Sequence, residues 1–188
     1  VTNGRGGCRD SLSIPAAFQV FDTLALPVAE VLTVNVVDDS TVALLWDAAS
    51  EPNFTDFQVW RTARSDSAFL PVFRSNDPFN THLVSSGLDA LQEVYEFRVS
   101  KSGECAPEPS LEALPIYNSV ELSARADSNG WGLQWNSYSS SRIEGYELFR
   151  MAEGDPQFQS IALIDAHQNT FKESAVLCPG RYSYVLKV

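Results

Sequence analysis

The sequence predicts an all-β fold built of two tandem antiparallel β-sandwiches. Three observations point to this fold: short runs of alternating apolar residues, turn-forming residues between the runs, and one pattern that occurs twice. The segment FQVWR at residues 57–61 returns as YELFR at residues 146–150, which lie 89 residues further along the chain. The chain of 188 residues therefore holds two copies of one domain of about 90 residues.

The repeat extends through most of both copies when the sequence is shifted by 89 residues. Aromatic and aliphatic residues then fall on residues of the same kind, and chance does not produce so many matches at one offset. The matching pairs include Leu44 with Leu133, Trp46 with Trp135, Phe57 with Tyr146, Val59 with Leu148, Trp60 with Phe149, Arg61 with Arg150, Thr81 with Thr170, Leu88 with Leu177, Tyr95 with Tyr184, Phe97 with Leu186 and Val99 with Val188.

Each copy is predicted to consist of short strands. Residues 41–46 place Val42, Leu44 and Trp46 on one face, because alternate residues of a strand share a face. Similar alternation is found at residues 57–60, 95–99, 131–135 and 182–188. Turn formers separate these runs at residues 38–40, 51–53, 75–78, 127–130 and 179–180. The 44% hydrophobic content is ample for a packed core, and no long amphipathic helix is evident.

Four segments of the chain resemble the fibronectin type III family. TVALLW at residues 41–46 resembles the second strand, and FQVWR and YELFR resemble the third. Leu177-Cys-Pro-Gly followed by Tyr184 resembles the signature before the sixth strand, although the first copy has Ala90 and Leu91 in place of Pro and Gly. The resemblance implies tandem immunoglobulin-like (fibronectin type III) antiparallel β-sandwiches, with the Tyr184 hydroxyl bonded back to its corner. It also implies a structural core that contains Leu44, Trp46, Leu133, Trp135, Tyr95 and Tyr184.

The repeat predicts three parts along the chain. Residues 1–27 resemble the last strand and linker of a preceding domain, because VTNGRGGC has the character of the segment VSKSGEC that begins at Val99. Residues 28–117 are predicted to form one fibronectin type III-like domain, and residues 118–188 a second one that lacks its last strand. We therefore expect the native chain to continue in both directions, since an open sheet edge favours pairing.

The three cysteines are Cys8, Cys105 and Cys178. In a sandwich of this topology, Cys105 and Cys178 lie in loops at opposite ends of the sixth strand, about 30 Å apart, whereas disulfides need Cα atoms within about 7 Å. Each cysteine is therefore expected to pair with a residue outside residues 1–188, in an oxidising compartment. The alternative is three unpaired thiols.

The composition and motifs exclude several classes of function. The net charge is −11 and the 13 Lys and Arg residues are scattered, so a nucleic-acid or anionic membrane surface is not expected. No apolar run is long enough to insert into a membrane, and no nucleophile elbow, phosphate loop or zinc motif is found. His82 and His167 occupy different places in the repeat and are interpreted as solvated residues. The chain is therefore predicted not to be an enzyme.

No cofactor is predicted, with calcium as the one alternative. Asp38 and Asp39, together with the neighbourhood of Glu51 and Asp56, offer carboxylates at one pole of the first sandwich, and oxygen ligands of this kind hold calcium. Acidic turn residues on an acidic protein explain the same pattern without a metal.

Trp60 and Phe149 are the candidate partner-binding aromatics. They alternate with core residues, so they are expected on the outer face of the sheet, where aromatics stack on sugars or dock a partner. The other interpretation is that each covers a neighbouring strand. Arg61 and Arg150 are expected to stack or pair nearby on the same sheet.

The sequence predicts a non-catalytic structural spacer and interaction segment, adhesive in character, of a larger secreted or cell-surface protein. The phrase shared by residues 57–61 and 146–150 is similar to repeats in secreted and surface proteins of the Bacteroidetes, which implies type IX secretion or a gliding-associated array. Its partners would be other domains of the same longer chain and a protein or glycan. One alternative is a carbohydrate-binding accessory module of a secreted hydrolase. Another, a receptor-like ligand site at the domain junction, lacks the Trp-Ser-x-Trp-Ser motif.

Overall fold

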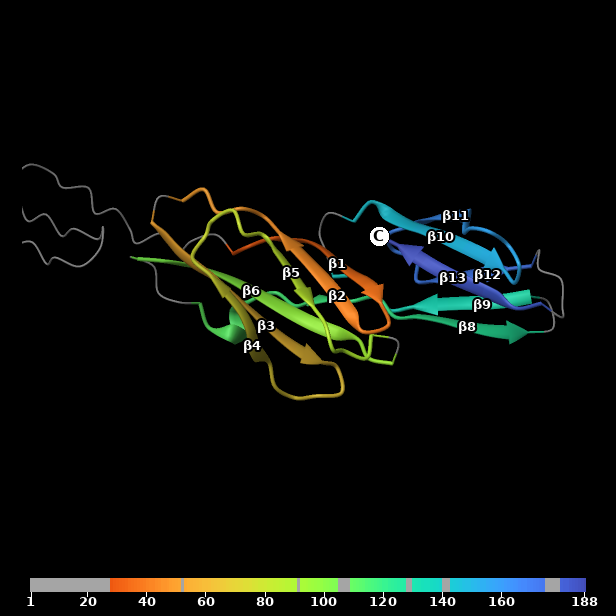
Figure 1. The fold of residues 1–188 in the computed structure, drawn as a ribbon, viewed down its shortest axis with the longest axis horizontal. Helices are drawn as coiled ribbons and strands as arrows, with labels where there is room; N and C mark the ends of the chain where they lie inside the picture. Colours follow the sequence, from red (N-terminus) through yellow and green to blue (C-terminus); the bar gives the residue numbers. More distant parts are fainter. Residues whose placement is uncertain are drawn as a thin grey trace, which may run out of the picture.

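The structure is a computed structural model that describes residues 28–51, 53–90, 92–104, 109–127, 130–139, 143–174 and 180–188 (Figure 1). The strand and linker predicted within residues 1–27 lie outside the described residues. The three cysteines, Cys8, Cys105 and Cys178, also lie outside them, so their predicted pairing stays a prediction.

The first sandwich packs a three-stranded sheet against a four-stranded sheet, and all paired strands are antiparallel. The first sheet has the order β1-β2-β5, and these strands are β1 (Val31–Asp38), β2 (Thr41–Trp46) and β5 (His82–Ser85). The second has the order β4-β3-β6-β7, with β3 (Phe54–Ala63), β4 (Leu70–Ser75), β6 (Tyr95–Gly103) and β7 (Tyr117–Asn118). A 3-10 turn at Leu111–Ala113 precedes β7.

The second sandwich repeats this arrangement with two three-stranded sheets. One has the order β12-β9-β8, with β8 (Leu122–Asp127), β9 (Gly130–Trp135) and β12 (Thr170–Glu173). The other has the order β11-β10-β13, with β10 (Gly145–Ala152), β11 (Gln159–Asp165) and β13 (Tyr182–Lys187). Figure 1 shows the two sandwiches end to end. The predicted fold class, tandem immunoglobulin-like antiparallel β-sandwiches, is confirmed.

β7 has no counterpart among the described residues of the second sandwich. β7 ends at Asn118, one residue beyond the predicted boundary at residue 117, and β8 begins at Leu122. The domain limits given above therefore stay predictions. The only helical element in the described part of the chain is the three-residue 3-10 turn, and no described helix is long and apolar enough to cross a membrane.

The constant offset of 89 residues is right for the early strands and wrong for the last two. Leu44 pairs with Leu83 and Leu133 pairs with Phe171, so β5 and β12 correspond with an offset of 88. β6 and β13 correspond with an offset of 87, and their equivalent cross-strand pairs are Arg61 with Phe97 and Arg150 with Tyr184. Tyr182, rather than Tyr184, is therefore the counterpart of Tyr95. The second copy is shorter by two residues between its fourth and sixth strands.

One tryptophan fills the space between the sheets of each sandwich. The ring of Trp46 meets Phe57 edge-on with centroids 5.7 Å apart, and the ring of Trp135 meets Tyr146 in the same way at 5.4 Å. Alternation along β2 and β9 makes this possible, because every second side chain points to the facing sheet. Of the predicted core residues, five are buried and Tyr184 is partly buried; the five are Leu44, Trp46, Tyr95, Leu133 and Trp135.

Two valines of the first sandwich form a matched pair for testing the core. Val59 on β3 is fully buried, whereas the side chain of Val84 on β5 is 60% exposed. Val59→Ala should lower the free energy of unfolding by about 2–3 kcal/mol, because it removes buried methyl groups and leaves a cavity. Val84→Ala should change it by less than about 0.5 kcal/mol. Urea unfolding followed by tryptophan fluorescence measures both, and equal effects would contradict the assigned core.

Candidate functional site at the junction of the two sandwiches

The two candidate aromatics lie in different sandwiches and are both partly buried. Trp60 stands between Pro71 of β4 and Arg98 of β6 in the strand register. Phe149 has the ammonium group of Lys187 4.5 Å from its ring centroid. Neighbouring strands thus place side chains beside both rings. A role for them in binding sugars or a partner stays a prediction.

Arg61 and Arg150 stack on tyrosines of their own sheets, as expected, but their hydrogen bonds reach the facing sheet. The guanidinium of Arg61 lies 5.7 Å from the Tyr95 ring centroid and donates to the Ser85 hydroxyl. That of Arg150 lies 5.5 Å from the Tyr182 ring and donates to the Glu173 carboxylate. Each arginine therefore links the two sheets at one end of its sandwich.

The tyrosine that bonds back to its corner is found in the first copy, where the Pro and Gly of the signature are missing. The Tyr95 hydroxyl accepts a hydrogen bond from the Asp89 amide at 2.9 Å, the geometry of a tyrosine corner. The Tyr184 hydroxyl instead donates to Glu173 at 2.7 Å. Burial, and then the hydrogen bond and charge of Glu173, raise the pKa of the Tyr184 phenol well above its ordinary value. Leu177, Cys178 and Pro179 of the signature lie outside the described residues.

Three of the four carboxylates considered for calcium, those of Asp38, Glu51 and Asp56, have protein partners of their own. Asp38 accepts from the Ser40 amide at 2.8 Å, and this bond holds its pKa below the ordinary value. Asp56 pairs with Arg74 at 2.9 Å. Glu51 pairs with the buried Lys101 at 2.8 Å. Burial raises the pKa of Glu51, but the bond and charge of Lys101, together with hydrogen bonds from backbone amides, outweigh burial, so this pKa is lowered.

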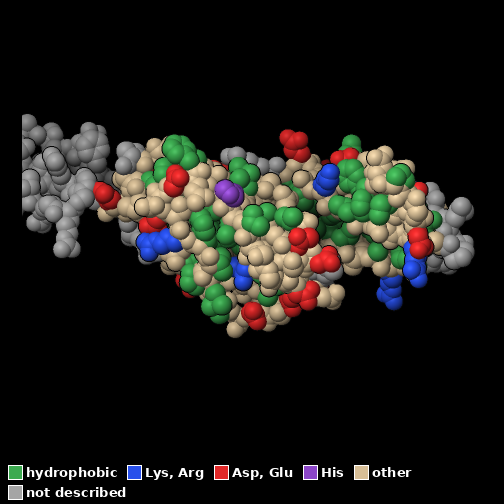
Figure 2. Space-filling view, viewed as in Figure 1, with side chains coloured by type: hydrophobic (Ala, Val, Ile, Leu, Met, Phe, Trp, Pro, Cys, Tyr) green, Lys and Arg blue, Asp and Glu red, His purple; other side chains and the backbone are tan. Residues whose placement is uncertain are grey.

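Within the described residues, no group of three His, Cys, Asp or Glu side chains could hold a metal ion. His82 and His167 are exposed, on β5 and in the turn after β11. Figure 2 shows acidic side chains scattered over the face in view rather than gathered at one place. The absence of a cofactor and of nucleic-acid binding stays a prediction.

Arg61 and Arg150 occupy equivalent positions, but Arg61 bonds to a neutral serine and Arg150 to a carboxylate. Replacing each arginine should therefore cost different amounts of stability. The Glu173 side chain is 7% exposed, so Arg150→Met would leave a buried carboxylate without its cation and should cost about 3 kcal/mol of unfolding free energy. Arg61→Met leaves only the Ser85 hydroxyl and should cost about 1 kcal/mol. Chemical denaturation measures both, and an equal loss in the two variants would contradict the assigned pairing.

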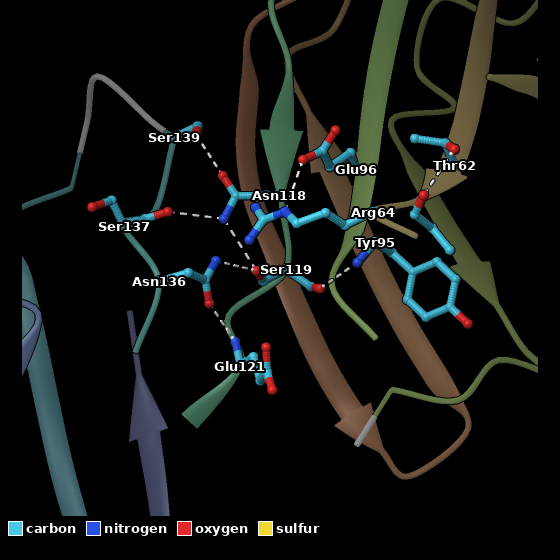
Figure 3. A network of polar contacts seen from close by, with 11 residues as sticks. Thr62, Arg64, Tyr95, Glu96, Asn118, Ser119, Glu121, Asn136, Ser137 and Ser139 are labelled. Carbon is cyan, nitrogen blue, oxygen red and sulfur yellow. Dashed lines mark hydrogen bonds and ion pairs between the residues drawn. The ribbon is translucent and has the colours of Figure 1, made fainter. Parts of the chain in front are cut away.

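A buried polar network joins the two sandwiches at residues 118–119 (Figure 3). The side-chain amide of Asn118 donates to the Ser137 carbonyl at 2.9 Å and to the Ser119 carbonyl at 3.1 Å, and its oxygen accepts from the Ser139 hydroxyl. Asn136 donates to the same Ser119 carbonyl at 2.9 Å. Asn118, which is 3% exposed and belongs to β7 of the first sandwich, thus ties the loop after β9 of the second.

Ser119 ties the same segment back to the first sandwich. Its hydroxyl accepts from the Tyr95 amide at 2.9 Å, and its own amide donates to the Tyr95 carbonyl at 2.8 Å. Two residues further on, the Glu121 amide donates to Asn136 at 2.6 Å. Asn118, Ser119 and Glu121 therefore bond on both sides of the junction, and little free chain separates the sandwiches.

Tyr138 bridges the sandwiches directly. It follows β9, is 8% exposed, and its hydroxyl accepts a hydrogen bond from the amide of Val34 on β1. Its own amide donates to the Tyr146 hydroxyl at 3.3 Å. Burial raises the pKa of the Tyr138 phenol, although the bond from Val34 works in the other direction. A buried amide without a partner is costly, so this hydroxyl anchors the second sandwich on β1.

Sequence reasoning missed the junction residues, and the signal that could have found them is a break in the repeat. At an offset of 89 residues, Tyr138 stands opposite Ala49 and Asn118 opposite Ala29. Both alanines are buried in the first sandwich. Positions where a buried small residue of one copy becomes a large polar residue in the other indicate a contact that only one copy makes.

No protein-family model matches the chain, and no curated protein matches its sequence. Among solved structures, it is similar to the FN1–FN3 domains of chicken CNTN1, at 14% identity and a TM-score of 0.39 over 86% of this chain and 60% of that one. It is also similar to a two-domain fibronectin type III segment of chicken tenascin, at 13% identity and a TM-score of 0.37 over 85% and 90%. The fold assignment rests on the sheet topology and not on these similarities.

Removal of the Tyr138 hydroxyl should loosen the junction. Tyr138→Phe leaves the buried Val34 amide without its acceptor, at a cost of about 1–3 kcal/mol, and should speed hydrogen exchange at Val34. Tyr95→Phe is the matched control: it removes a tyrosine hydroxyl bond within the first sandwich and should leave exchange at Val34 unchanged. Unchanged exchange at Val34 in Tyr138→Phe would contradict this role.

Proposed function

We propose that this chain is a non-catalytic structural spacer and interaction segment of a larger secreted or cell-surface protein. The observation that carries the proposal is the junction, where Tyr138 and Asn118 bond the second sandwich to the first within buried surroundings. A junction bonded in this way resists bending, because bending would expose buried polar groups to water or leave them without hydrogen-bond partners. A spacer needs a stiff junction, since it must hold the domains at its two ends apart.

The arrangement of the sandwiches supports the same proposal. The two units follow each other along the longest axis of the molecule (Figure 1), so the length of one sandwich adds to that of the other. The link between them is short, because β7 of the first sandwich ends at Asn118 and β8 of the second begins at Leu122. Pro109 and Pro115 precede β7 and so lie within the first sandwich. The loops at the poles are free to vary and to contact other domains of the same protein.

The setting of the protein belongs to the proposal as well. We place the segment outside the cell, in an array of similar domains, and the repeated phrase at residues 57–61 and 146–150 favours an array of the kind that bacteria export by type IX secretion. The exposed faces of the sheets would bind its adhesive partner, a protein or a glycan.

The spacer proposal is tested by measuring the distribution of distances across the junction. Val84 of β5 and Leu163 of β11 are exposed by 60% and 84% and can be replaced by spin-labelled cysteines in a chain whose three native cysteines are serine. Pulsed electron resonance should give one narrow distribution. A pair at Val84 and Leu70, both in the first sandwich, supplies the width expected for a rigid body.

A junction distribution as narrow as that control supports the spacer, and Tyr138→Ala should broaden it. A broad distribution in the unmodified junction would mean that the sandwiches move independently, and the spacer proposal would fail. Labels that shift the far-ultraviolet dichroism would be moved to other exposed strand positions before comparison.

A further inference from the structure

The outer face of the β12-β9-β8 sheet carries a group of polar and charged side chains. Leu133 and Trp135 of β9 are buried between the sheets, so the residues that alternate with them, and the partners of those residues on β8 and β12, face outward. All but the glycine among them are exposed. They form two neighbouring rows across the sheet, a charged row of Arg125, Gly132 and Lys172 and a neutral row of Ser123, Gln134 and Thr170.

A hollow of about 700 Å³ lies over the two rows, and all six residues line it. Its floor is the backbone of the sheet, which is open at Gly132 because glycine has no side chain. Arg125 and Lys172 stand on either side of this floor, about 10 Å apart at the backbone, since neighbouring strands are spaced by about 4.8 Å. Figure 2 shows Lys and Arg side chains projecting from the side of the second sandwich where β8 runs.

Neither packing nor backbone conformation requires the glycine at position 132. Its φ is not positive, and a Cβ added there would meet only the Arg125 carbonyl oxygen, at an ordinary contact distance of 3.7 Å. Glycine within a strand lowers stability, because it loses much conformational freedom on folding and packs no side chain. A glycine that the fold does not require, at the floor of a hollow, indicates a place where a ligand approaches the backbone closely.

The first copy lacks this arrangement. Its row equivalent to the charged row holds Asn35, Ala43 and Val84, none of which carries a charge. The two copies share their core pattern but differ on this outer face, so the two cations do not belong to what the repeated fold requires. They also stand together on a chain whose net charge is −11.

We propose that this hollow binds an acidic polysaccharide, with the carboxylate of one sugar ring over Gly132 and between Arg125 and Lys172. Arginine and lysine bind carboxylates through charge-assisted hydrogen bonds, and the bare backbone at the glycine lets the ring lie close to the sheet. The ring hydroxyls would meet the neutral row. The Ser123 hydroxyl there donates to the Gln134 carbonyl at 3.1 Å and so presents its lone pairs to a ligand donor.

The chemistry of the hollow favours a sugar over other anions. Protein interfaces centre on buried aromatic or apolar side chains, and neither row presents one. Single-stranded nucleic acids bind by stacking their bases on aromatic rings, which the two rows also lack. A polymer of uronic acids carries one carboxylate on each ring and hydroxyls around it, and this alternation of charge and hydroxyl matches a charged row beside a neutral one.

This proposal deepens the interaction part of the function proposed above, on which it rests, by naming a face and a class of ligand. It does not depend on the spacer part. The distance measurement across the junction tests the spacer with no ligand present, so a failure of one proposal is distinguishable from a failure of the other.

The test titrates the isotope-labelled 188-residue chain with a hexamer of galacturonic acid and follows the backbone amide resonances. We expect saturable binding with the largest shifts at Arg125, Gly132 and Lys172. The same hexamer with its carboxylates reduced to alcohols should bind about tenfold more weakly or less, because the charge-assisted bonds are lost. Arg125→Gln and Lys172→Gln should each weaken binding of the acidic hexamer and reduce its dependence on salt.

Gly132→Val separates binding from folding. Valine suits a strand and its Cβ has room, so the variant should keep or raise the urea midpoint of unfolding. Its side chain would occupy the floor of the hollow, and it should weaken binding by about tenfold or more. Ala43→Val is the matched control at the equivalent outward position of the first copy, and it should leave binding of the hexamer unchanged.

Three results would overturn the proposal. They are the absence of saturable binding at millimolar hexamer, unchanged binding by a folded Gly132→Val variant, and equally tight binding of a glutamate hexamer, which would mean that the cations attract any acidic chain. If Gly132→Val does not fold, Gly132→Ala and Arg125→Gln supply the comparison. Unchanged binding in both of these variants would also overturn the proposal.

Discussion

Backbone amide and carbonyl groups at the ends and edges of the two sandwiches must find partners, and this requirement shapes most of the molecule. Between strands the ladders satisfy it, but where a strand ends, a side chain or a neighbouring segment has to take over. Tyr95 does so for the Asp89 amide, Ser119 for the backbone of Tyr95, and Tyr138 for the Val34 amide. The Tyr138 hydroxyl reaches from the second sandwich to the first, so the bond that satisfies the buried Val34 amide also holds the two sandwiches together.

Both copies link their two sheets through an arginine, but the acceptor of its hydrogen bond differs. Both place an arginine of the third strand against a tyrosine of the sixth and across to the fifth. In the first copy the acceptor is the neutral Ser85, whereas in the second it is the buried carboxylate of Glu173, which also holds the Tyr184 hydroxyl. A buried charge is stable only while its partner remains, so the second copy depends more strongly on one residue than the first does.

The properties of the junction suit one use of the pair of domains. The junction is short, its residues are buried, and they are bonded to both sandwiches, and these properties suit the transmission of position along a chain of domains. A cleft lies beside the junction, and both sandwiches help to line it. Bending at the junction would change the shape of that cleft, because β1 forms one wall while β8 and β13 form the others.

The sequence by itself determined the all-β fold, the duplication and the strand faces, because alternation of apolar residues and turn formers are local properties. It also placed Leu44, Trp46, Leu133 and Trp135 between the sheets, since a large apolar side chain on an alternating strand has to be buried. It misplaced the counterpart of Tyr95 by two residues, because similar residues alternate along the sixth strand and hide the loss of one residue before the fifth strand and of another after it.

Only the tertiary structure decided which polar residues meet. Tyr138 and Val34 are 104 residues apart, and nothing local in either segment indicates the other. The same holds for Arg150 and Glu173, whose pairing depends on two sheets facing each other at a particular register. Hydrogen bonds across a junction depend on the relative position of two folded bodies, and that position follows from packing over the whole interface rather than from the pattern of any one segment.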